Sequence, residues 1–352
     1  MKATPCQGSW PALIERRHYQ VPLPDFAPMI EPTLNYVLCP GPGAAAVPAG
    51  QDPAAARPVT GPQHRMAYWE WNATGNPAHS HVIVCVHGLS RQGRDFDVLA
   101  RQLSQHARVV CPDVVGRGQS DWLADPMGYQ IPQYGADMVA LLAQLHQQAP
   151  ITTLDWVGTS MGGLIGMGIT GQPDLPLPVP VRRLVLNDVG PVIQWQALQR
   201  IGQYLGFLAK FESLQQAADA MWTISTSFGP HTPAQWLELS RAMVRSLPEG
   251  GVTLHYDPAI AVPFRSLTQE AATAGEAFLW QLYDQITART LLLRGAQSDL
   301  LSHDTAQAMA ARGPRAQLVE FAGVGHAPTL VAADQVAAVR DFLLAEEGTA
   351  AA

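Results

Sequence analysis

A serine in a glycine-rich pentapeptide is the clearest candidate for chemistry in this chain. Ser160 is the middle residue of Gly-Thr-Ser-Met-Gly at 158–162, between an apolar run at 154–157 and a small, apolar run at 162–169. This pattern predicts a strand, a sharp turn and a helix, with the serine hydroxyl exposed at the turn. The glycines leave room beside the turn. The start of the helix supplies partial positive charge where an oxyanion would form.

A histidine and an acid follow this serine, each after a predicted strand. The apolar run 290–295 leads to Asp299, and the run 317–321 leads to a glycine-containing loop with His326. A histidine can remove the serine proton during attack on a carbonyl carbon. A carboxylate can hold the imidazole in the correct tautomer. The chain order serine, acid, histidine is therefore typical of one class of serine hydrolase.

Two other acids compete with Asp299 for this role. Asp188 follows the apolar run 184–187, which predicts a sixth strand, and is the genuine alternative. Asp304 is expected in the first turn of the next helix, where acidic side chains are common. We expect Asp299 to be the acid, because in serine hydrolases with this chain order the acid more often follows the later strand.

A second turn is expected beside the serine. The continuous apolar run 82–86 predicts a strand buried on both faces of a parallel sheet, and it ends in His-Gly-Leu-Ser at 87–90. The backbone N–H groups of Leu89 and Met161 are expected to form an oxyanion hole. The histidine of this turn is predicted to be structural, as are Asp113 and Ser120 in the glycine turns that follow the next strand.

These motifs together resemble the α/β-hydrolase superfamily, in the serine-nucleophile branch with a helical lid inserted after the sixth strand. The resemblance covers roughly residues 66–346. It implies an α/β fold with a mostly parallel central sheet and helices on both faces. Haloalkane dehalogenases and epoxide hydrolases of the superfamily carry aspartate at the position of Ser160, so the serine argues against those activities.

The chain divides into three predicted parts. Residues 1–60 are rich in proline, glycine and alanine and are expected to form an extended arm or loose linker. Residues 61–191 and 284–352 form the core, which begins with an antiparallel edge strand. Residues 192–283 are too long for an ordinary loop and predict a helical lid. Core helices are expected at about 93–105, 131–146, 161–170, 303–312 and 332–346.

Aromatic residues are frequent in the predicted lid. Each taken singly is expected to pack the lid's own small core. An inserted lid above a serine nucleophile also favours a few of them as substrate contacts, with Trp195, Trp222 and Trp236 as candidates.

Composition excludes several partner classes. The 352 residues carry a formal net charge of −7 and contain only two lysines, which argues against nucleic acid and anionic membrane surfaces. No apolar run has the length of a membrane span. The four cysteines lack metal-site or redox spacing, and the N-terminus lacks the apolar core of a signal peptide, so buried free thiols and a cytoplasmic location are expected. No cofactor or metal motif is present.

Three functions remain compatible with the residues. The first is hydrolysis of a small to medium, largely apolar carboxylic ester, including lactones, thioesters and short hydroxyacid oligomers. The second is cleavage of a carbon–carbon bond in a ring-fission dienoate, which needs cations such as Arg91, Arg94 or Arg200 for the substrate acid. The third is a ligand sensor with slow turnover. We expect the first.

Overall fold

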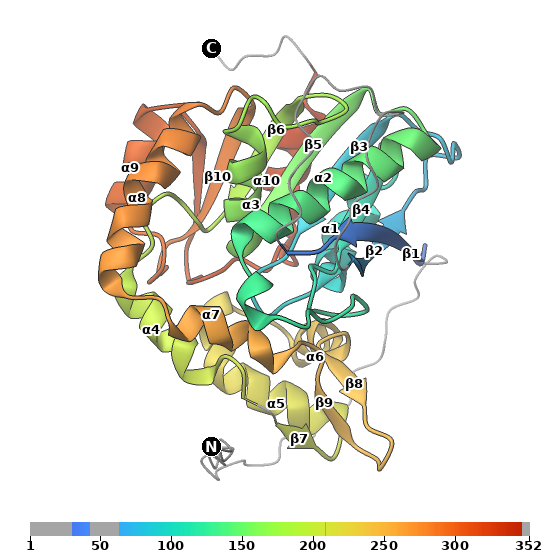
Figure 1. The fold of residues 1–352 in the computed structure, drawn as a ribbon, viewed down its shortest axis with the longest axis vertical. Helices are drawn as coiled ribbons and strands as arrows, with labels where there is room; N and C mark the ends of the chain where they lie inside the picture. The colour runs from blue at the N-terminus through green and yellow to red at the C-terminus, as the bar shows by residue number, and fades with distance from the viewer. Residues whose placement is uncertain (1–29, 43–62, 208, 347–352) are drawn as a thin grey trace. The chain divides into compact units, whose positions relative to one another are not determined.

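The computed structural model describes residues 30–42, 63–207 and 209–346. Eight strands form one sheet in the order β1-β2-β4-β3-β5-β6-β10-β11 (Figure 1). The strands are β1 (Thr33–Pro40), β2 (Gln63–Trp71), β3 (His81–Val86), β4 (Arg108–Pro112), β5 (Thr153–Thr159), β6 (Val181–Asn187), β10 (Arg289–Gly295) and β11 (Gln317–Phe321). The strands β4, β3, β5, β6, β10 and β11 run parallel, and β2 pairs antiparallel with both of its neighbours, β1 and β4. The predicted mostly parallel α/β sheet is confirmed.

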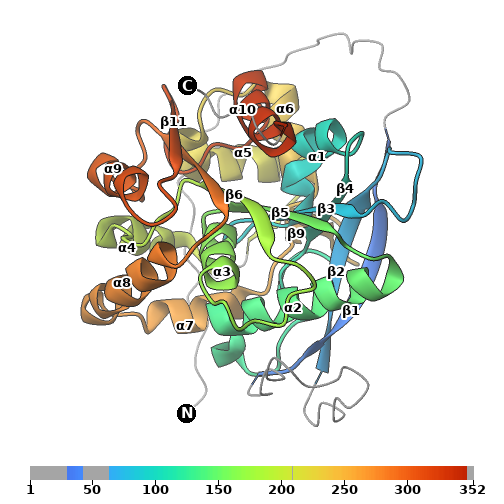
Figure 2. The same cartoon turned by 90° about the horizontal axis from the view of Figure 1, so that it is seen from above.

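Helices cover both faces of this sheet, because side chains alternate along each strand. From β3, Val82, Val84 and Val86 pack on one face, whereas Ile83 and Cys85 pack on the other. Figure 2 shows the helices α2 and α3 on the first face and α1 and α10 on the second. The core helices are α1 (Asp97–Leu103), α2 (Ile131–Gln148), α3 (Met161–Thr170), α9 (His303–Ala311) and α10 (Ala333–Leu344). All five lie where the sequence predicts helices, within a few residues; a short 3₁₀ helix precedes α1.

The first strand corrects the expectation of a loose arm. Residues 33–40 form β1, which pairs along its whole length with β2, from Thr33 opposite Glu70 to Pro40 opposite Gln63. β2 therefore lies inside the sheet, and the edge strand is β1. The hydrogen bonds between β1 and β2, together with the burial of alternate β1 residues, hold β1 against β2. In the sequence, the proline-rich segments on either side of β1 obscure this strand pattern. Most of the remaining arm lies outside the described residues.

A buried polar cluster ties β1 to α2. His64 Nε2 lies 3.0 Å from Asp137 Oδ2, and Gln133 donates to the other carboxylate oxygen of Asp137 and to the carbonyl of Pro40. The donor atoms of Cys39, His64 and Asp137 lie within 4.8 Å of one another. Burial raises the pKa of the Cys39 thiol far above its usual range, so the thiol stays protonated. We interpret the cluster as a hydrogen-bonded tie. The three described cysteines are buried and free, as expected.

An insertion, defined as residues 192–284, separates β6 from β10. Figure 1 shows it at the ends of the parallel strands. It consists of the helices α4 (Trp195–Tyr204), α5 (Leu214–Ser225), α6 (Pro233–Arg241), α7 (Ala261–Arg265) and α8 (Gln269–Asp284), and of the strands β7 (Lys210–Phe211), β8 (Val244–Ser246) and β9 (Val252–Leu254). The three short strands form a small antiparallel sheet, so the segment is not purely helical. No helix in the described parts of the chain could span a bilayer.

The close contact of α3 with β3 leaves no room for a side chain at Gly162. Substitution of this glycine therefore tests the packing. A Cβ atom there would overlap the backbone carbonyl of Val86, whereas a Cβ at Gly168 in the same helix meets only Gln172 Nε2 at 3.8 Å. We expect Gly162→Ala to lower the free energy of unfolding by about 1–3 kcal/mol. Gly168→Ala, the matched control, should raise it by about 0.5–1 kcal/mol through helix propensity. Urea denaturation measures both, and equal stabilities would contradict the packing.

Candidate active site

The turn between β5 and α3 holds Ser160 in a strained backbone conformation, with φ of 52° and ψ of −115°. The Ser160 N–H donates to the carbonyl of Asn187 at 2.9 Å, which anchors the turn to β6. Gly158 and Gly162 face each other across the turn, and a Cβ on Gly158 would overlap the Gly162 carbonyl. The strained serine is therefore held by backbone contacts that only glycine permits. This is the elbow that the sequence predicts.

The imidazole of His326 lies between Ser160 and a buried carboxylate. Its Nε2 is 3.0 Å from Ser160 Oγ, and its Nδ1 is 2.7 Å from Asp188 Oδ2. Asp188 is fully buried at the end of β6, and it accepts hydrogen bonds from the Gly295 N–H at 2.9 Å and the Ser298 hydroxyl at 2.7 Å. A carboxylate with these donors orients the imidazole so that Nε2 faces the serine.

Asp299 does not reach His326, and the prediction of Asp299 as its partner is wrong. Its carboxylate binds the Arg200 guanidinium of α4 at 2.7 and 2.9 Å, with nearly half of the side chain exposed. The preceding residue, Ser298, points inward to Asp188 instead. β6 lies next to β5 in the sheet, so the end of β6 is one strand from Ser160. The alternative acid, Asp188, occupies the position. Asp304 lies in the first turn of α9, as expected.

The turn after β3 brings Leu89 beside the serine, where Leu89, Ser160 and Met161 border the same cavity. His87 is fully buried and structural, as predicted. It accepts from the Val114 N–H at 2.9 Å through Nε2, and its Nδ1 lies 2.7 Å from the Gly88 carbonyl. Burial lowers the pKa of His87 to about 3, so the ring is neutral.

The loop after β4 is fastened by the two residues that the sequence assigned to it. Asp113 accepts from the N–H groups of Gly93 at 2.7 Å and Gln119 at 2.9 Å. Ser120 Oγ accepts from the Ala67 N–H at 2.8 Å and donates to the Asp113 carbonyl. Burial raises the pKa of Asp113 to about 6. Both side chains therefore fix the turn and lie outside the cavity.

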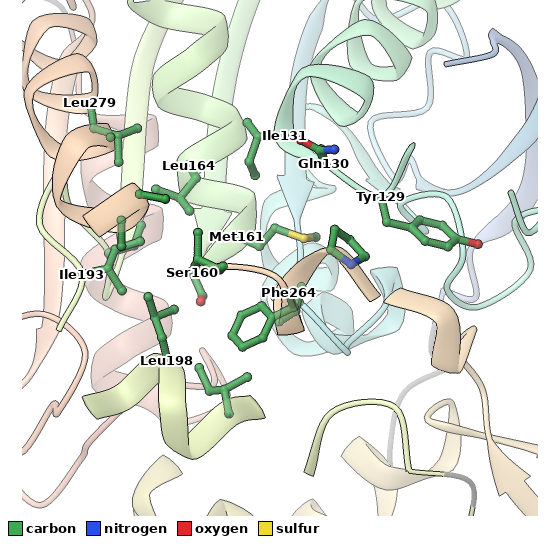
Figure 3. Close-up of a pocket in the computed structure, with 18 of the residues that line it drawn as sticks. Tyr129, Gln130, Ile131, Ser160, Met161, Leu164, Ile193, Leu198, Phe264 and Leu279 are labelled. Carbon is green, nitrogen blue, oxygen red and sulfur yellow. The ribbon is translucent and has the colours of Figure 1, made fainter. Parts of the chain in front are cut away.

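A cavity of about 550 Å³ opens above Ser160. Figure 3 shows the apolar side chains of Leu164, Ile193, Leu198 and Phe264 around the Ser160 hydroxyl. The insertion contributes aliphatic and aromatic lining residues from α4, α7, α8 and adjoining loops: Ile193, Leu198, Ile201, Phe264, Leu267 and Leu279. Among the described lining residues, Glu276 is the only charged one. Such a cavity suits an uncharged acyl group.

The tryptophan candidates do not line this cavity, so that prediction is wrong for all three. Trp222 and Trp236 pack edge to face with ring centroids 4.9 Å apart, and Trp236 Nε1 donates to the Ala218 carbonyl at 2.8 Å. They form the insertion's own core with Phe211 and Met243. Trp195 begins α4 outside the cavity. Aliphatic residues at helical spacing in α4 and α8 were the overlooked signal.

The sequence profile described as "Alpha/beta hydrolase family" matches residues 83–339. The chain belongs to this family. A 3-hydroxybutyrate-oligomer hydrolase of Cupriavidus necator is 51% identical over 284 residues, which cover 79% of this chain and 92% of that protein. A pimeloyl-[acyl-carrier protein] methyl ester esterase of Xanthomonas campestris pv. campestris is 27% identical, covering 74% of this chain and 93% of that protein.

A solved structure agrees with this assignment. An α/β hydrolase from Novosphingobium aromaticivorans superposes with a TM-score of 0.71 and 33% identity, covering 90% of this chain and 99% of that one. The predicted superfamily and the predicted class of enzyme, a hydrolase of carboxylic esters, are confirmed.

The cations that a ring-fission substrate would need are engaged elsewhere in this α/β hydrolase. Arg91 pairs with Asp95 at 2.6 Å, and Arg94 pairs with Asp97 at 2.6 Å. Arg200 holds Asp299, as described above. None of these arginines lines the cavity.

Substitution of the two competing acids tests the hydrogen-bond geometry. Asp188→Asn should lower kcat by about 10⁴-fold, because an amide in this position favours the wrong imidazole tautomer. Asp299→Asn, the matched control, should leave kcat within about twofold, since surface ion pairs contribute little. Steady-state hydrolysis of p-nitrophenyl butyrate measures both. The reverse ranking would return the role to Asp299.

The buried, neutral ring of His87 predicts a dependence of stability on pH. Below pH 6.5 the unfolded chain protonates this histidine, whereas the folded protein does so only near its pKa of about 3. His87 thus stabilises the fold above pH 6.5 and loses this contribution as pH falls toward 3, at about 1.4 kcal/mol per pH unit.

The variant His87→Gln keeps a donor and an acceptor but does not titrate. The free energy of unfolding of this variant, measured by urea denaturation from pH 7 to pH 4, should fall with pH less steeply than that of the wild type. The two slopes should differ by about 1.4 kcal/mol per pH unit. Parallel pH profiles for the two proteins would show that His87 is not neutral and buried in solution.

Proposed function

We propose that this α/β hydrolase cleaves short oligomers of 3-hydroxybutyrate or a closely related hydroxyacid at Ser160. The observation that carries the proposal is the apolar cavity of about 550 Å³ above a serine already within hydrogen-bond distance of His326. The similarity to the Cupriavidus necator enzyme, which is named for such oligomers, supports this substrate class.

The proposed mechanism begins with attack of Ser160 Oγ on an ester carbonyl while His326 Nε2 takes the serine proton. Asp188 stabilises the imidazolium that forms. The N–H groups of Leu89 and Met161 donate to the oxyanion, and each such donor contributes about 10²–10³ in kcat. As the tetrahedral intermediate collapses, the bond between the carbonyl carbon and the alcohol oxygen breaks, and His326 protonates that oxygen so that the fragment leaves as an alcohol. Water then attacks the acyl-enzyme through the same residues.

The chemistry of a hydroxyacid oligomer matches the distribution of charge around Ser160. In such a chain, the acyl fragment of any ester bond carries the free hydroxyl end, and the leaving fragment always carries the free carboxylate. The described residues that line the cavity include no cation, and they include Glu276, so the cavity disfavours a carboxylate and suits the acyl fragment. The leaving fragment, which His326 protonates, departs on the other side with its negative charge toward solvent.

The proposed substrate is a small molecule that is apolar along most of its length, and the proposed location is the cytoplasm. Three buried free thiols among the described residues support a reducing compartment.

The direct test is hydrolysis of purified 3-hydroxybutyrate dimer, trimer and tetramer, with release of monomer measured by chromatography. The wild-type enzyme should release monomer from all three oligomers, and Ser160→Ala should lower the rate by about 10⁴–10⁶-fold. Ser246→Ala, at an exposed serine of β8 that does not line the cavity, serves as the matched control and should leave the rate unchanged.

Two other results would revise the proposal. Hydrolysis of p-nitrophenyl butyrate without any cleavage of hydroxybutyrate oligomers would reject the substrate but keep the ester chemistry. An acyl-enzyme that forms once and does not turn over on any ester would favour the ligand sensor.

A further inference from the structure

Arg117 is a fully buried cation next to the proposed oxyanion hole. It lies between Gly116 and Gly118, which have φ of 84° and 52°, in the loop after β4. Its Nε donates to the Leu89 carbonyl at 2.8 Å, and its Nη2 lies 3.6 Å from Met161 Sδ. One guanidinium therefore contacts both residues whose N–H groups are proposed to bind the oxyanion.

The remaining contacts of this guanidinium are also to neutral groups. Nη1 donates to the Val115 carbonyl at 2.7 Å and to the Tyr134 hydroxyl at 3.0 Å. The charge also lies 5.0 Å from the Tyr134 ring centroid and 5.8 Å from that of Tyr129. Within the described part of the chain, none of the ion pairs includes Arg117. The Asp257 carboxylate accepts a hydrogen bond from the Tyr129 hydroxyl at 2.5 Å, and the Asp257 N–H donates to the Gly116 carbonyl at 2.7 Å.

A buried cation without a carboxylate is costly, because dipoles and aromatic faces replace water only in part. This cost falls when a negative charge forms nearby in a site of low dielectric. The tetrahedral intermediate at Ser160 places an oxyanion beside Leu89 and Met161, the two residues that Arg117 holds. The interaction is therefore stronger in the transition state than in the ground state, which is the condition for accelerating the chemical step.

We propose that Arg117 is a positioning residue of the oxyanion hole. Its guanidinium holds the Leu89 carbonyl and the Met161 side chain, which fixes the residue whose N–H, in the preceding peptide, is proposed to bind the oxyanion. Its charge is balanced by the oxyanion during acylation. This proposal rests on Ser160 as the proposed nucleophile but does not depend on which ester is the substrate.

The test compares Arg117→Lys, which keeps the charge, with Arg117→Gln, which removes it. Stopped-flow bursts with p-nitrophenyl butyrate give the acylation rate and the half-saturating concentration, and burst amplitude corrects for inactive protein. Arg117→Gln should acylate about 100-fold more slowly than wild type, with the half-saturating concentration changed less than threefold. Arg117→Lys should recover about tenfold of that loss and so remain about tenfold slower than wild type. The inhibition constant of butylboronic acid, which forms an anionic tetrahedral adduct on serine, should weaken in parallel with the rate.

The matched control is Arg65→Met, which removes an exposed ion pair with Asp121 just beyond the same loop and should leave the acylation rate unchanged. Equal acylation rates for the lysine and glutamine variants would overturn the proposal. An increase in the half-saturating concentration as large as the loss in acylation rate would also overturn it. If the glutamine variant does not fold, the lysine variant decides alone, because it lacks the fork: slower acylation supports the positioning role, and a wild-type rate overturns it.

The outcomes separate this proposal from the proposed function. Failure to cleave hydroxybutyrate oligomers, with normal bursts on p-nitrophenyl butyrate, leaves the test of Arg117 intact. A wild-type enzyme that neither shows a burst nor binds the boronic acid would overturn the oxyanion hole and both proposals together.

Discussion

The close approach of α3 to the sheet is the constraint on which the candidate site depends. Backbone meets backbone where Gly158 and Gly162 pass each other and where α3 lies against the end of β3. This contact sets the height of Ser160 above the sheet and its distance from the turn that carries Leu89. The strain at Ser160 is tolerated because the sheet and the helix are both held by large buried faces on either side of it.

The acid of the site is selected by strand order. Parallel strands end at one edge of the sheet, and residues at the ends of neighbouring strands can meet there although they are distant in sequence. β6 lies directly beside β5, so the end of β6 is one strand spacing from Ser160. His326, from the loop after β11, lies between Asp188 and Ser160. The later loop still contributes, because Ser298 orients Asp188 while Asp299 turns outward to Arg200. In the dipeptide Ser298-Asp299, the serine therefore contacts the candidate site, and the aspartate forms an ion pair at the surface.

Different parts of the insertion have different roles. Its middle part packs around Trp236 as a small core, whereas residues of α4, α7 and α8, on either side of that part in the sequence, line the cavity. The insertion is also fastened to the loop of Arg117, since the Gly118 N–H donates to the His255 carbonyl and the Asp257 N–H donates to the Gly116 carbonyl. The residues that shape the cavity and those beside the oxyanion hole are therefore mechanically connected.

The sequence alone determined the features that depend on near neighbours in the chain: the glycine-flanked serine, the buried parallel strands, the five core helices and the histidine in the last loop. Only the tertiary structure decided between Asp188 and Asp299, added β1 to the sheet, and excluded the tryptophans from the cavity. Each of these depends on which strands lie side by side and on which way a loop side chain turns. Arg117 shows the same limit, because three of its hydrogen-bonding partners, Leu89, Tyr134 and Met161, come from segments distant in sequence that meet only in the folded protein.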